Sequence, residues 1–498
     1  MIRPDVVIVN WLLALPFFAA FCSELFPGIA ARVHSKAEAQ SLAPGPFLLG
    51  ALASVMGVVL SLSLMPALGP GGVNVNYWWT ADLYHMRFVA DGLAAFVILA
   101  IFGLGLLIHL HMAGLPEASQ PHHRAALLLA AQGCGVGAVL SADVVALVFL
   151  LELMLVCLWA LAAMDAPKGA FRMLATAHVG GLLVLGGMLV AWQEAGNTSL
   201  AALPLLLVSA DPGTTGVIAF GILLGLLPLI SGVPGHGWGP LLAKDGAAVA
   251  VAPTSLLLLV GGYGLLRLLP GTLILPAVPA LGGTALAVGL CALGWGALHV
   301  WLARGLRQVA AWLTVAQSGY LLIALGVAAG SNQPPACLRA ASLHVLLTPL
   351  ALIAVWSAAS GLVTRVGTDA IAALGGLFRQ MPLVGVALLA GGMSIAGVPP
   401  LGGFRVQQQL LSGLVAEGRF VLTALLVIAD VIIALAVVGV FRRTFLRGVH
   451  PPTVLRSSPW LSVQLVLVVA ALLASGIWGT PLARWSEGLQ NTVLSISP

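Results

Sequence analysis

Two stretches of the sequence decide its fold: GVPGHGW at residues 232–238 and GVPPLGGF at residues 397–404. Each lies in an apolar run, and each combines glycine with proline, which removes a helical hydrogen bond and clashes with the preceding turn. In hydrocarbon the freed backbone groups need partners, so such breaks persist only inside a protein or beside a watery cavity. The recurring G-V-P order predicts two broken membrane helices in a repeated unit, as in ion transporters. The alternative is that glycine and proline are simply frequent in membrane helices.

The composition around these breaks is that of a membrane protein. Hydrophobic residues make up 60% of the 498 residues and charged residues 7%, whereas a soluble protein carries about 25% charged residues. Apolar runs of about twenty residues recur, each long enough to span a bilayer. These numbers exclude a soluble enzyme, a disordered chain and a secreted disulfide scaffold. We expect no metal cluster and no nucleic-acid binding, because the five cysteines are scattered and no basic run exceeds two residues.

The apolar runs predict an all-α polytopic membrane protein with about 14 transmembrane helices in one transmembrane domain, residues 1–498. The first run lacks a basic region and a cleavage site, so it is expected to be a retained helix. N-terminal helices are expected in residues 1–123, and a C-terminal helix and tail in 447–498. Two inverted five-helix repeats are expected between them, spans four to eight in 124–270 and spans nine to thirteen in 281–446, with spans seven and twelve broken. An interfacial segment is expected at residues 74–91.

The positive charges predict the orientation. Of the 21 lysines and arginines, fourteen lie in the loops that follow odd-numbered spans and seven on the other side. The positive-inside rule puts the odd-numbered loops in the cytoplasm and both termini on the non-cytoplasmic side.

Several short motifs, in a fixed order over about residues 80–445, carry a family resemblance. They are DGL at 91–93, LELM at 151–154, PGHGW at 234–238, GGYGLLR at 261–267, RQVAAWLTVAQSGY at 307–320, His344, and the second break at 397–404. The chain resembles the antiporter-like membrane subunits of respiratory complex I (NADH:quinone oxidoreductase) and of Mrp-type multisubunit cation/proton antiporters. The resemblance implies a fourteen-helix subunit that passes protons along a polar axis, with other membrane and peripheral subunits as partners, in a bacterial inner membrane.

The chain departs from this family at the residues that carry its transport chemistry. The family places lysines along the axis, where a buried lysine can take up and release a proton. The resemblance puts those positions at Leu229, Leu259, Thr348 and Gln407. None of the four is a lysine, so the resemblance implies the scaffold more directly than it implies an intact pump.

The remaining polar residues in the spans are the candidates for a proton path: Glu152, His236, His344 and Asp430. Glu152 is the only charge in residues 145–161, and a carboxylate there costs roughly 2.5–3.5 kcal/mol, so it should face the interior and be paired or protonated. The resemblance makes it the axis glutamate, for which His236 could replace the missing lysine. The alternative for each is a hydrogen-bonded group that only packs, and for His178 and His299 this is at least as good an interpretation.

Three further residues could tune the path: Arg405, Gln407 and Lys244. Arg405 follows the second break directly and keeps its proton, so it could act only electrostatically or extend to the interface. Lys244 and Asp245 are expected to form a local ion pair or a solvated loop. Gln317 and Tyr320 could line the axis, but single polar residues more often make helix–helix hydrogen bonds.

Three functions remain open from the sequence. The first is a proton-translocating subunit of a complex I-like or Mrp-like assembly, for which partner subunits supply the driving reaction because the chain has no dinucleotide or phosphate-binding motif and no cysteine cluster. It would need no cofactor and would not be catalytic alone, although it could belong to an NADH:quinone oxidoreductase-like translocase. The second is a degenerate, non-conducting scaffold subunit, which a dry axis would favour. The third is the membrane partner in a two-component inorganic-carbon uptake complex.

Overall fold

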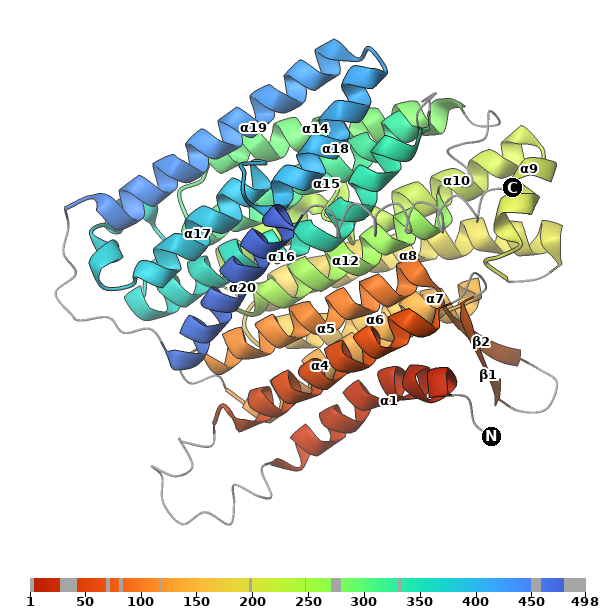
Figure 1. Ribbon diagram of the computed structural model, residues 1–498, viewed down its shortest axis with the longest axis horizontal. Helices are drawn as coiled ribbons and strands as arrows, with labels where there is room; N and C mark the ends of the chain where they lie inside the picture. The colour runs from red at the N-terminus through yellow and green to blue at the C-terminus, as the bar shows by residue number, and fades with distance from the viewer. Residues whose placement is uncertain are drawn as a thin grey trace.

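The computed structural model describes residues 4–26, 43–68, 72–79, 84–115, 119–196, 199–246, 248–269, 279–329, 334–448 and 458–478. These residues form a bundle of apolar helices that lie largely side by side (Figure 1). Twelve described helices are long and apolar enough to cross a membrane. The predicted class, an all-α polytopic membrane protein, is confirmed, and one two-stranded antiparallel sheet is added to it.

The twelve continuous helices lie at the predicted apolar runs. They are α1 Pro4–Glu24, α4 Gly45–Leu64, α5 Gly92–Ala113, α6 Pro121–Leu140, α7 Val144–Ala163, α8 Pro167–Ala195, α12 Val251–Leu268, α14 Pro279–Leu302, α15 Leu306–Ala328, α16 Pro334–Val366, α19 Phe420–Phe441 and α20 Pro459–Ile477. The two remaining predicted spans are interrupted segments. The inverted relation of the two repeats and the sides of the loops stay predictions.

The first interrupted segment runs from α10 (Pro212–Leu226) through a break to the short helices η2 (Gly235–Gly237) and α11 (Trp238–Asp245). Ser231 adopts a left-handed backbone conformation in this break, with φ of 58°. The fully buried indole of Trp238 donates a hydrogen bond to the Pro228 carbonyl at 2.8 Å. The break therefore satisfies a freed carbonyl from inside the protein, as a non-helical segment at membrane depth requires.

The second interrupted segment joins α17 (Pro382–Ile395) to α18 (Gly402–Ala416). Gly397 has φ of 68°, a conformation that glycine adopts without strain. The Gly403 amide donates to the Ser394 hydroxyl at 3.0 Å, and a Cβ at Gly403 would lie 1.7 Å from the Ser394 carbonyl oxygen. Glycine is therefore needed where the second half-helix begins.

The centre of the bundle is formed by α12, α15 and α16. The most apolar stretch of α12 is 100% buried, whereas that of α19 is 28% buried and those of α1 and α20 are 33% buried. The outer helices carry their exposed leucine, valine and phenylalanine side chains around the bundle. An apolar surface of this extent is stable against lipid rather than water. Because α12 is apolar, the helices packed around it must supply the polar groups of any internal path.

Two strands lie between the second and the third predicted spans. Strands β1 (Val73–Trp79) and β2 (Tyr84–Ala90) pair antiparallel. The sequence predicted an interfacial segment here but not a pair of strands. Asp91 then caps α5 by accepting a hydrogen bond from the Ala94 amide at 2.9 Å. The same carboxylate is ion-paired with Arg267 at the end of α12. The start of α5 is thereby fixed to the central helix.

Candidate functional site

Glu152 lies in the middle of α7 and is hydrogen-bonded to His178 of α8, with 2.9 Å between Oε2 and Nδ1. Gly181, about one turn after His178, leaves room for the carboxylate, because a Cβ at that position would lie 1.8 Å from Oε1. In the isolated chain 22% of the Glu152 side chain and 55% of the His178 side chain are exposed. His178 is therefore exposed at the outer face of α8, whereas most of the Glu152 side chain is enclosed. Glu152 is paired, as the sequence predicted, and the partner is His178.

His236 is not the partner of Glu152, because His178 occupies that place. His236 lies in η2, with its ring 5.9 Å from the ring of Trp312. Trp312 stacks on His299 at 4.2 Å. The buried Nδ1 of His236 has no hydrogen-bond partner. The structure thus places His236 in an aromatic cluster, and its part in a proton path stays a prediction.

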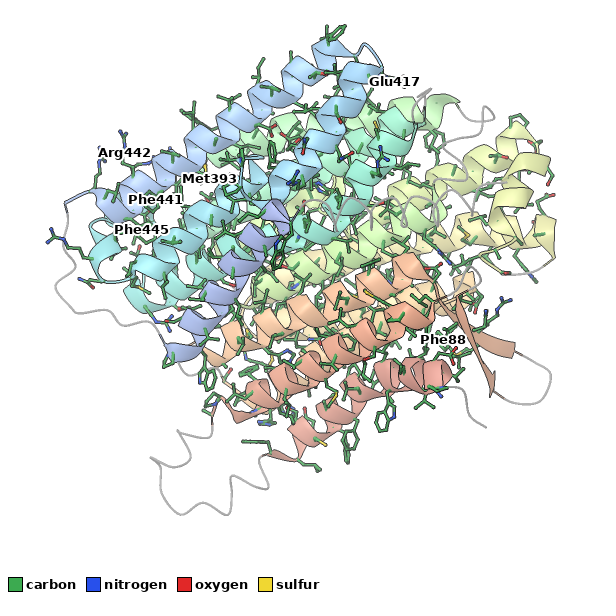
Figure 2. All side chains as sticks on the ribbon, in the orientation of Figure 1. Phe88, Met393, Glu417, Phe441, Arg442 and Phe445 are labelled. Atoms are coloured by element: carbon green, nitrogen blue, oxygen red, sulfur yellow. The ribbon has the colours of Figure 1, made fainter. Side chains whose placement is uncertain are left out.

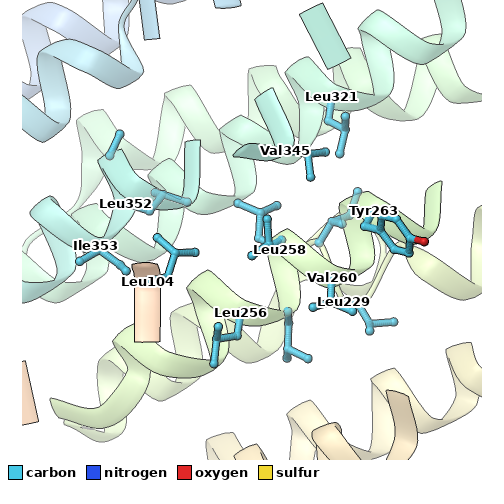
Figure 3. Close-up of a cluster of buried hydrophobic side chains, with 14 of the residues drawn as sticks. Leu104, Leu229, Leu256, Leu258, Val260, Tyr263, Leu321, Val345, Leu352 and Ile353 are labelled. Carbon is cyan, nitrogen blue, oxygen red and sulfur yellow. The ribbon is translucent and has the colours of Figure 1, made fainter. Parts of the chain in front are cut away.

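The two expected lysine positions beside the first break are filled by buried leucines. Leu229 lies in the first break and Leu259 in α12, and both are at most 1% exposed. Figure 3 shows Leu229 beside Val260 of α12, in a cluster of apolar side chains that includes Leu256 and Leu258. Gly261 packs against Leu229, since a Cβ there would lie 2.8 Å from the leucine Cβ. The axis is therefore dry at this point.

A polar cluster occupies the other half of the molecule, around Asp430 of α19. The Tyr320 hydroxyl of α15 donates a hydrogen bond to Asp430 Oδ1. The Gln407 side-chain amide of α18 donates to the same oxygen at 3.1 Å. Tyr320 is 1% exposed and Gln407 6%, so the carboxylate is held by two buried donors. Gln407 stands at an expected lysine position, and its Oε1 is buried without a partner.

His344 of α16 lies near this half of the axis and is 2% exposed. Its ring is hydrogen-bonded to the backbone of Gln317, whereas its Nε2 has no partner. The Gln317 side chain donates to the Ile395 carbonyl at 3.4 Å, where α17 ends at the second break. Thr348, one turn after His344, is buried as well. A neutral imidazole with one free nitrogen can accept a proton, so this position keeps acid–base chemistry that the leucines cannot supply.

The three predicted tuning residues differ in their contacts. Gln407 bonds Asp430, as described above. Arg405 instead donates to the Gly476 carbonyl of α20 at 3.0 Å and to Gln408 at 3.3 Å. Lys244 is exposed near the end of α11, and its neighbour Asp245 accepts a hydrogen bond from the Gly169 amide at 3.0 Å. Both residues lie in the short helix α11, so the expected solvated loop is wrong. Among the described residues Asp245 bonds α8, and no ion pair with Lys244 is formed.

Within the described ranges, no hydrogen bond or ion pair joins the Glu152–His178 pair to His236, His344 or Asp430. The predicted path residues thus form separate groups, with leucines between them. For His178 and Tyr320 the sequence left a path role and a packing role open, and their spacing from Glu152 and Asp430 along the chain does not reveal the contacts. The sequence signal that could have indicated the contact is Gly181, three residues after His178, because a glycine leaves room for the Glu152 carboxylate.

One further group of metal-ligand types meets outside these clusters. Glu24 at the end of α1 and the adjacent His122 and His123 of α6 place one ligand atom each within 4.8 Å of one another. The Glu24 carboxylate already bonds His123 Nδ1 at 2.7 Å. This group could not be predicted from the spacing of residues within one segment, because its members come from two helices, α1 and α6.

Comparison with known proteins agrees with this architecture. A family model described as NADH:quinone oxidoreductase/Mrp antiporter, TM, matches residues 141–433. NADH-quinone oxidoreductase subunit N of Geobacillus kaustophilus is 26% identical over 476 residues, which cover 89% of each chain. Formate hydrogenlyase subunit 3 of Escherichia coli is 29% identical over 289 residues, which cover 56% of this chain and 45% of that protein. A chain of the Mrp complex of a Dietzia species superposes with a TM-score of 0.80 at 17% identity, covering 100% of this chain and 98% of that one.

The matched segment spans more than half of the chain, from the start of α7 through both helix breaks to α19. The structural likeness covers the whole chain and supports the same fold. The protein therefore belongs to the NADH:quinone oxidoreductase/Mrp antiporter transmembrane family.

Proposed function

We propose that this chain is a proton-translocating, antiporter-like membrane subunit of a multisubunit ion-translocating complex, and that its proton-handling site is the cluster of Asp430, Tyr320 and Gln407. One observation carries the proposal: a carboxylate within a membrane helix is bonded by two buried donors beside the second helix break. Burying an ionised carboxylate costs roughly 2.5–3.5 kcal/mol even on the most lenient scale. Such a group is retained where its protonation is used.

The roles within the cluster follow from side-chain chemistry. A glutamine amide does not titrate, and the ordinary pKa of a tyrosine hydroxyl is about 10, so Asp430 is the group assigned to exchange the proton. Tyr320 and Gln407 orient its carboxylate and compensate its burial with hydrogen bonds. His344 supplies a second acid–base group on the same half of the axis. The second helix break lies close to His344, because Gln317 bonds the His344 ring through its backbone and the Ile395 carbonyl at the end of α17 through its side chain.

The outer face of α7 and α8 supports the proposed assembly. The Glu152–His178 pair lies near the middle of two apolar helices, with His178 exposed and Glu152 partly exposed. Ionisable groups at this depth are stable when they face protein or water rather than lipid. A neighbouring subunit that covers this face would shield the pair. The driving reaction would lie in such partners, because the chain itself carries no cofactor motif.

A second function, a non-conducting scaffold subunit, is favoured by a different observation. Leu229 and Leu259 occupy lysine positions of the family axis and are enclosed in hydrocarbon. A proton cannot cross a dry leucine core without a wire of water or titratable groups. Under this alternative the complex needs the chain for assembly, and the Asp430 cluster only packs.

One experiment separates the two functions. The intact complex is prepared in inverted membrane vesicles with Asp430→Asn, which keeps the size of the side chain and removes its titration. The matched control is Glu194→Gln, an exposed acid at the end of α8. We expect proton uptake to fall about a hundredfold or more, within the range of general acid–base contributions, while the control keeps the wild-type rate. Proton uptake that stays at the wild-type rate in a fully assembled Asp430→Asn complex would support the scaffold function instead.

We further propose that the chain resides in a bacterial inner membrane with both termini on the non-cytoplasmic side. The support is the excess of lysine and arginine, fourteen against seven of the 21, in the loops after odd-numbered spans. Cysteines introduced singly at residues 2 and 304 and labelled in intact cells with a membrane-impermeant reagent test it. Residue 2 should react and residue 304 should not, and the reverse pattern would overturn the orientation.

A further inference from the structure

A groove lies between the ends of two outer helices, on the side of the bundle away from the Glu152–His178 pair. It encloses about 280 Å³ between the end of α14 and the end of α19 and is lined by Trp301, Leu435, Ala436, Gly439, Arg442 and Arg443. Figure 2 labels Arg442 at the outer end of α19, with Phe441 and Phe445 beside it. Helix α19 is also the least buried of the continuous spans. The groove is thus open at the rim of the bundle.

No described residue neutralises the two arginines of the groove. Within the described residues, the Arg442 side chain is exposed and makes no hydrogen bond or ion pair, although its backbone amide caps α19. Arg443 donates from Nε to the Gly439 carbonyl at 3.1 Å, which leaves its two terminal nitrogens available. Helix α14 contains no acidic residue, and the only acid of α19 is Asp430, about three turns away and bonded to Tyr320. Two guanidinium groups therefore offer donors to an anion from outside.

The backbone beneath these arginines is held firmly. Phe441 and Phe445 stack at 5.3 Å on the inner side of the helix end. Phe445 and Thr444 are buried, and the short π-helical turn Arg442–Leu446 contains these two residues as well as both arginines. Anchoring one face of this turn fixes the direction of the other, so the arginines are presented outward rather than free to collapse onto the bundle.

The walls of the groove are apolar and continue along the helices. Leu435 and Trp301 are 56% and 55% exposed. From Leu435 an exposed row continues along α19 at helical spacing through Val431 and Ile428. Gly439 forms the floor, and a Cβ there would meet nothing closer than Arg443 at 3.8 Å. The groove thus has a cationic end, then a tryptophan, then an apolar strip. This order corresponds to the headgroup, glycerol region and acyl chain of a phospholipid.

We propose that this groove binds an anionic phospholipid, whose phosphodiester is held by Arg442 and Arg443 and whose acyl chain lies over Gly439 and Leu435 along α19. Guanidinium groups pair with phosphate oxygens through charge-assisted and often bidentate hydrogen bonds. Trp301 packs beside the glycerol region, where amphipathic rings are favoured. A zwitterionic lipid presents its own cation near the arginines and binds more weakly. The bound lipid would cover the outer edge of α14 and α19 and fix the two helix ends relative to each other.

The test uses the protein purified in its complex and placed in mixed micelles with equal amounts of phosphatidylglycerol and phosphatidylcholine. Native mass spectrometry counts the lipids that remain bound. The variants are Arg442→Gln with Arg443→Gln, and separately Gly439→Leu, which fills the floor and leaves both charges. The control is Arg447→Gln, which removes a neighbouring exposed charge outside the groove.

We expect both groove variants to lose retained phosphatidylglycerol about tenfold, the factor that 1.4 kcal/mol of lost binding free energy gives, while the control retains it. Because Gly439 faces open space, Gly439→Leu should assemble normally, and a size-exclusion profile checks this. Equal retention in all variants, equal retention of phosphatidylcholine, or full displacement by inorganic phosphate would overturn the proposal. A segment of another subunit found cross-linked to the Leu435→Cys variant would do the same.

Discussion

The ion pair between Asp91 and Arg267 gives the sharpest prediction about stability. Asp91 both caps α5 and pairs with Arg267 of the central helix α12. Only 16% and 13% of their side chains are exposed, so water screens the pair little. Asp91→Asn keeps an oxygen for the cap and removes the charge, whereas Asp91→Ala removes both. The two substitutions therefore separate the cap from the ion pair.

The expected magnitudes follow from these two contacts. Leaving one partner of a buried pair uncompensated costs about 3–5 kcal/mol, and this applies to Asp91→Asn because Arg267 keeps its charge. Loss of the cap adds about 1 kcal/mol in Asp91→Ala. Arg267→Met leaves the Asp91 carboxylate alone with the cap and should also destabilise the protein. The double variant Asp91→Asn with Arg267→Met should cost clearly less than the sum of the two single changes, by about 0.5–3 kcal/mol.

The free energy of unfolding is measured by titrating SDS into mixed micelles that hold the purified protein. The helical signal of α5 and α12 should be lost in one transition, since the pair joins them. Single effects that simply add in the double variant would refute the reasoning, because no coupling energy would then exist between the two residues. Equal losses in Asp91→Asn and Asp91→Ala would refute the separate role of the cap.

Three shorter predictions concern the axis, the outer pair and a surface cap. Leu259→Lys should lower the free energy of unfolding by roughly 2.5–3.5 kcal/mol in the same SDS titration, because the site is buried among apolar side chains. The control Leu259→Met should change it little. An equal effect of both substitutions would show that water reaches α12. Gly181→Ala should displace the Glu152 carboxylate and shift the ¹⁵N resonances of the imidazole bonded to it, while Gly186→Ala, which has open space around its Cβ, leaves them unchanged. Hydrogen bonds from the Thr214 side chain, and from backbone amides at the start of α10, hold the pKa of Asp211 below its usual value. Its contribution to stability is therefore present above the ordinary carboxyl pKa and lost as the pH falls through the lowered one, so Asp211→Asn should flatten the acid dependence of the melting temperature.

Much of the fold follows from the sequence because a bilayer imposes few solutions. Every backbone group in hydrocarbon must be bonded within its own segment, so an apolar run of sufficient length is a helix whatever surrounds it. The runs around α7 and α12 could therefore be assigned without tertiary contacts. The two G-V-P stretches were predictable for the complementary reason that proline cannot continue a helix. The β-hairpin before α5 escaped this reasoning, since it lies outside the long apolar runs and its strands are defined by pairing with each other.

The candidate site was predicted less completely. The sequence identifies Glu152 and Asp430 because a lone carboxylate in an apolar run costs free energy wherever it lies. It does not identify their partners, since His178 and Tyr320 are 26 and 110 positions away along the chain. It offered His236 as a residue that could replace the missing partner of Glu152, whereas the His236 ring lies beside Trp312.

By itself the sequence determined the membrane class, the helical segments, the two breaks and the absence of lysines from positions 229, 259, 348 and 407. These are local properties, fixed by the hydropathy and backbone chemistry of each segment. Only the tertiary structure decided that Leu229 and Leu259 close into one dry core, that Glu152 is paired with His178, and that Asp430 is held by Tyr320 and Gln407. Those outcomes depend on how helices rotate about their axes when they pack, and a rotation of a single residue, about 100°, turns a side chain from the axis to the lipid.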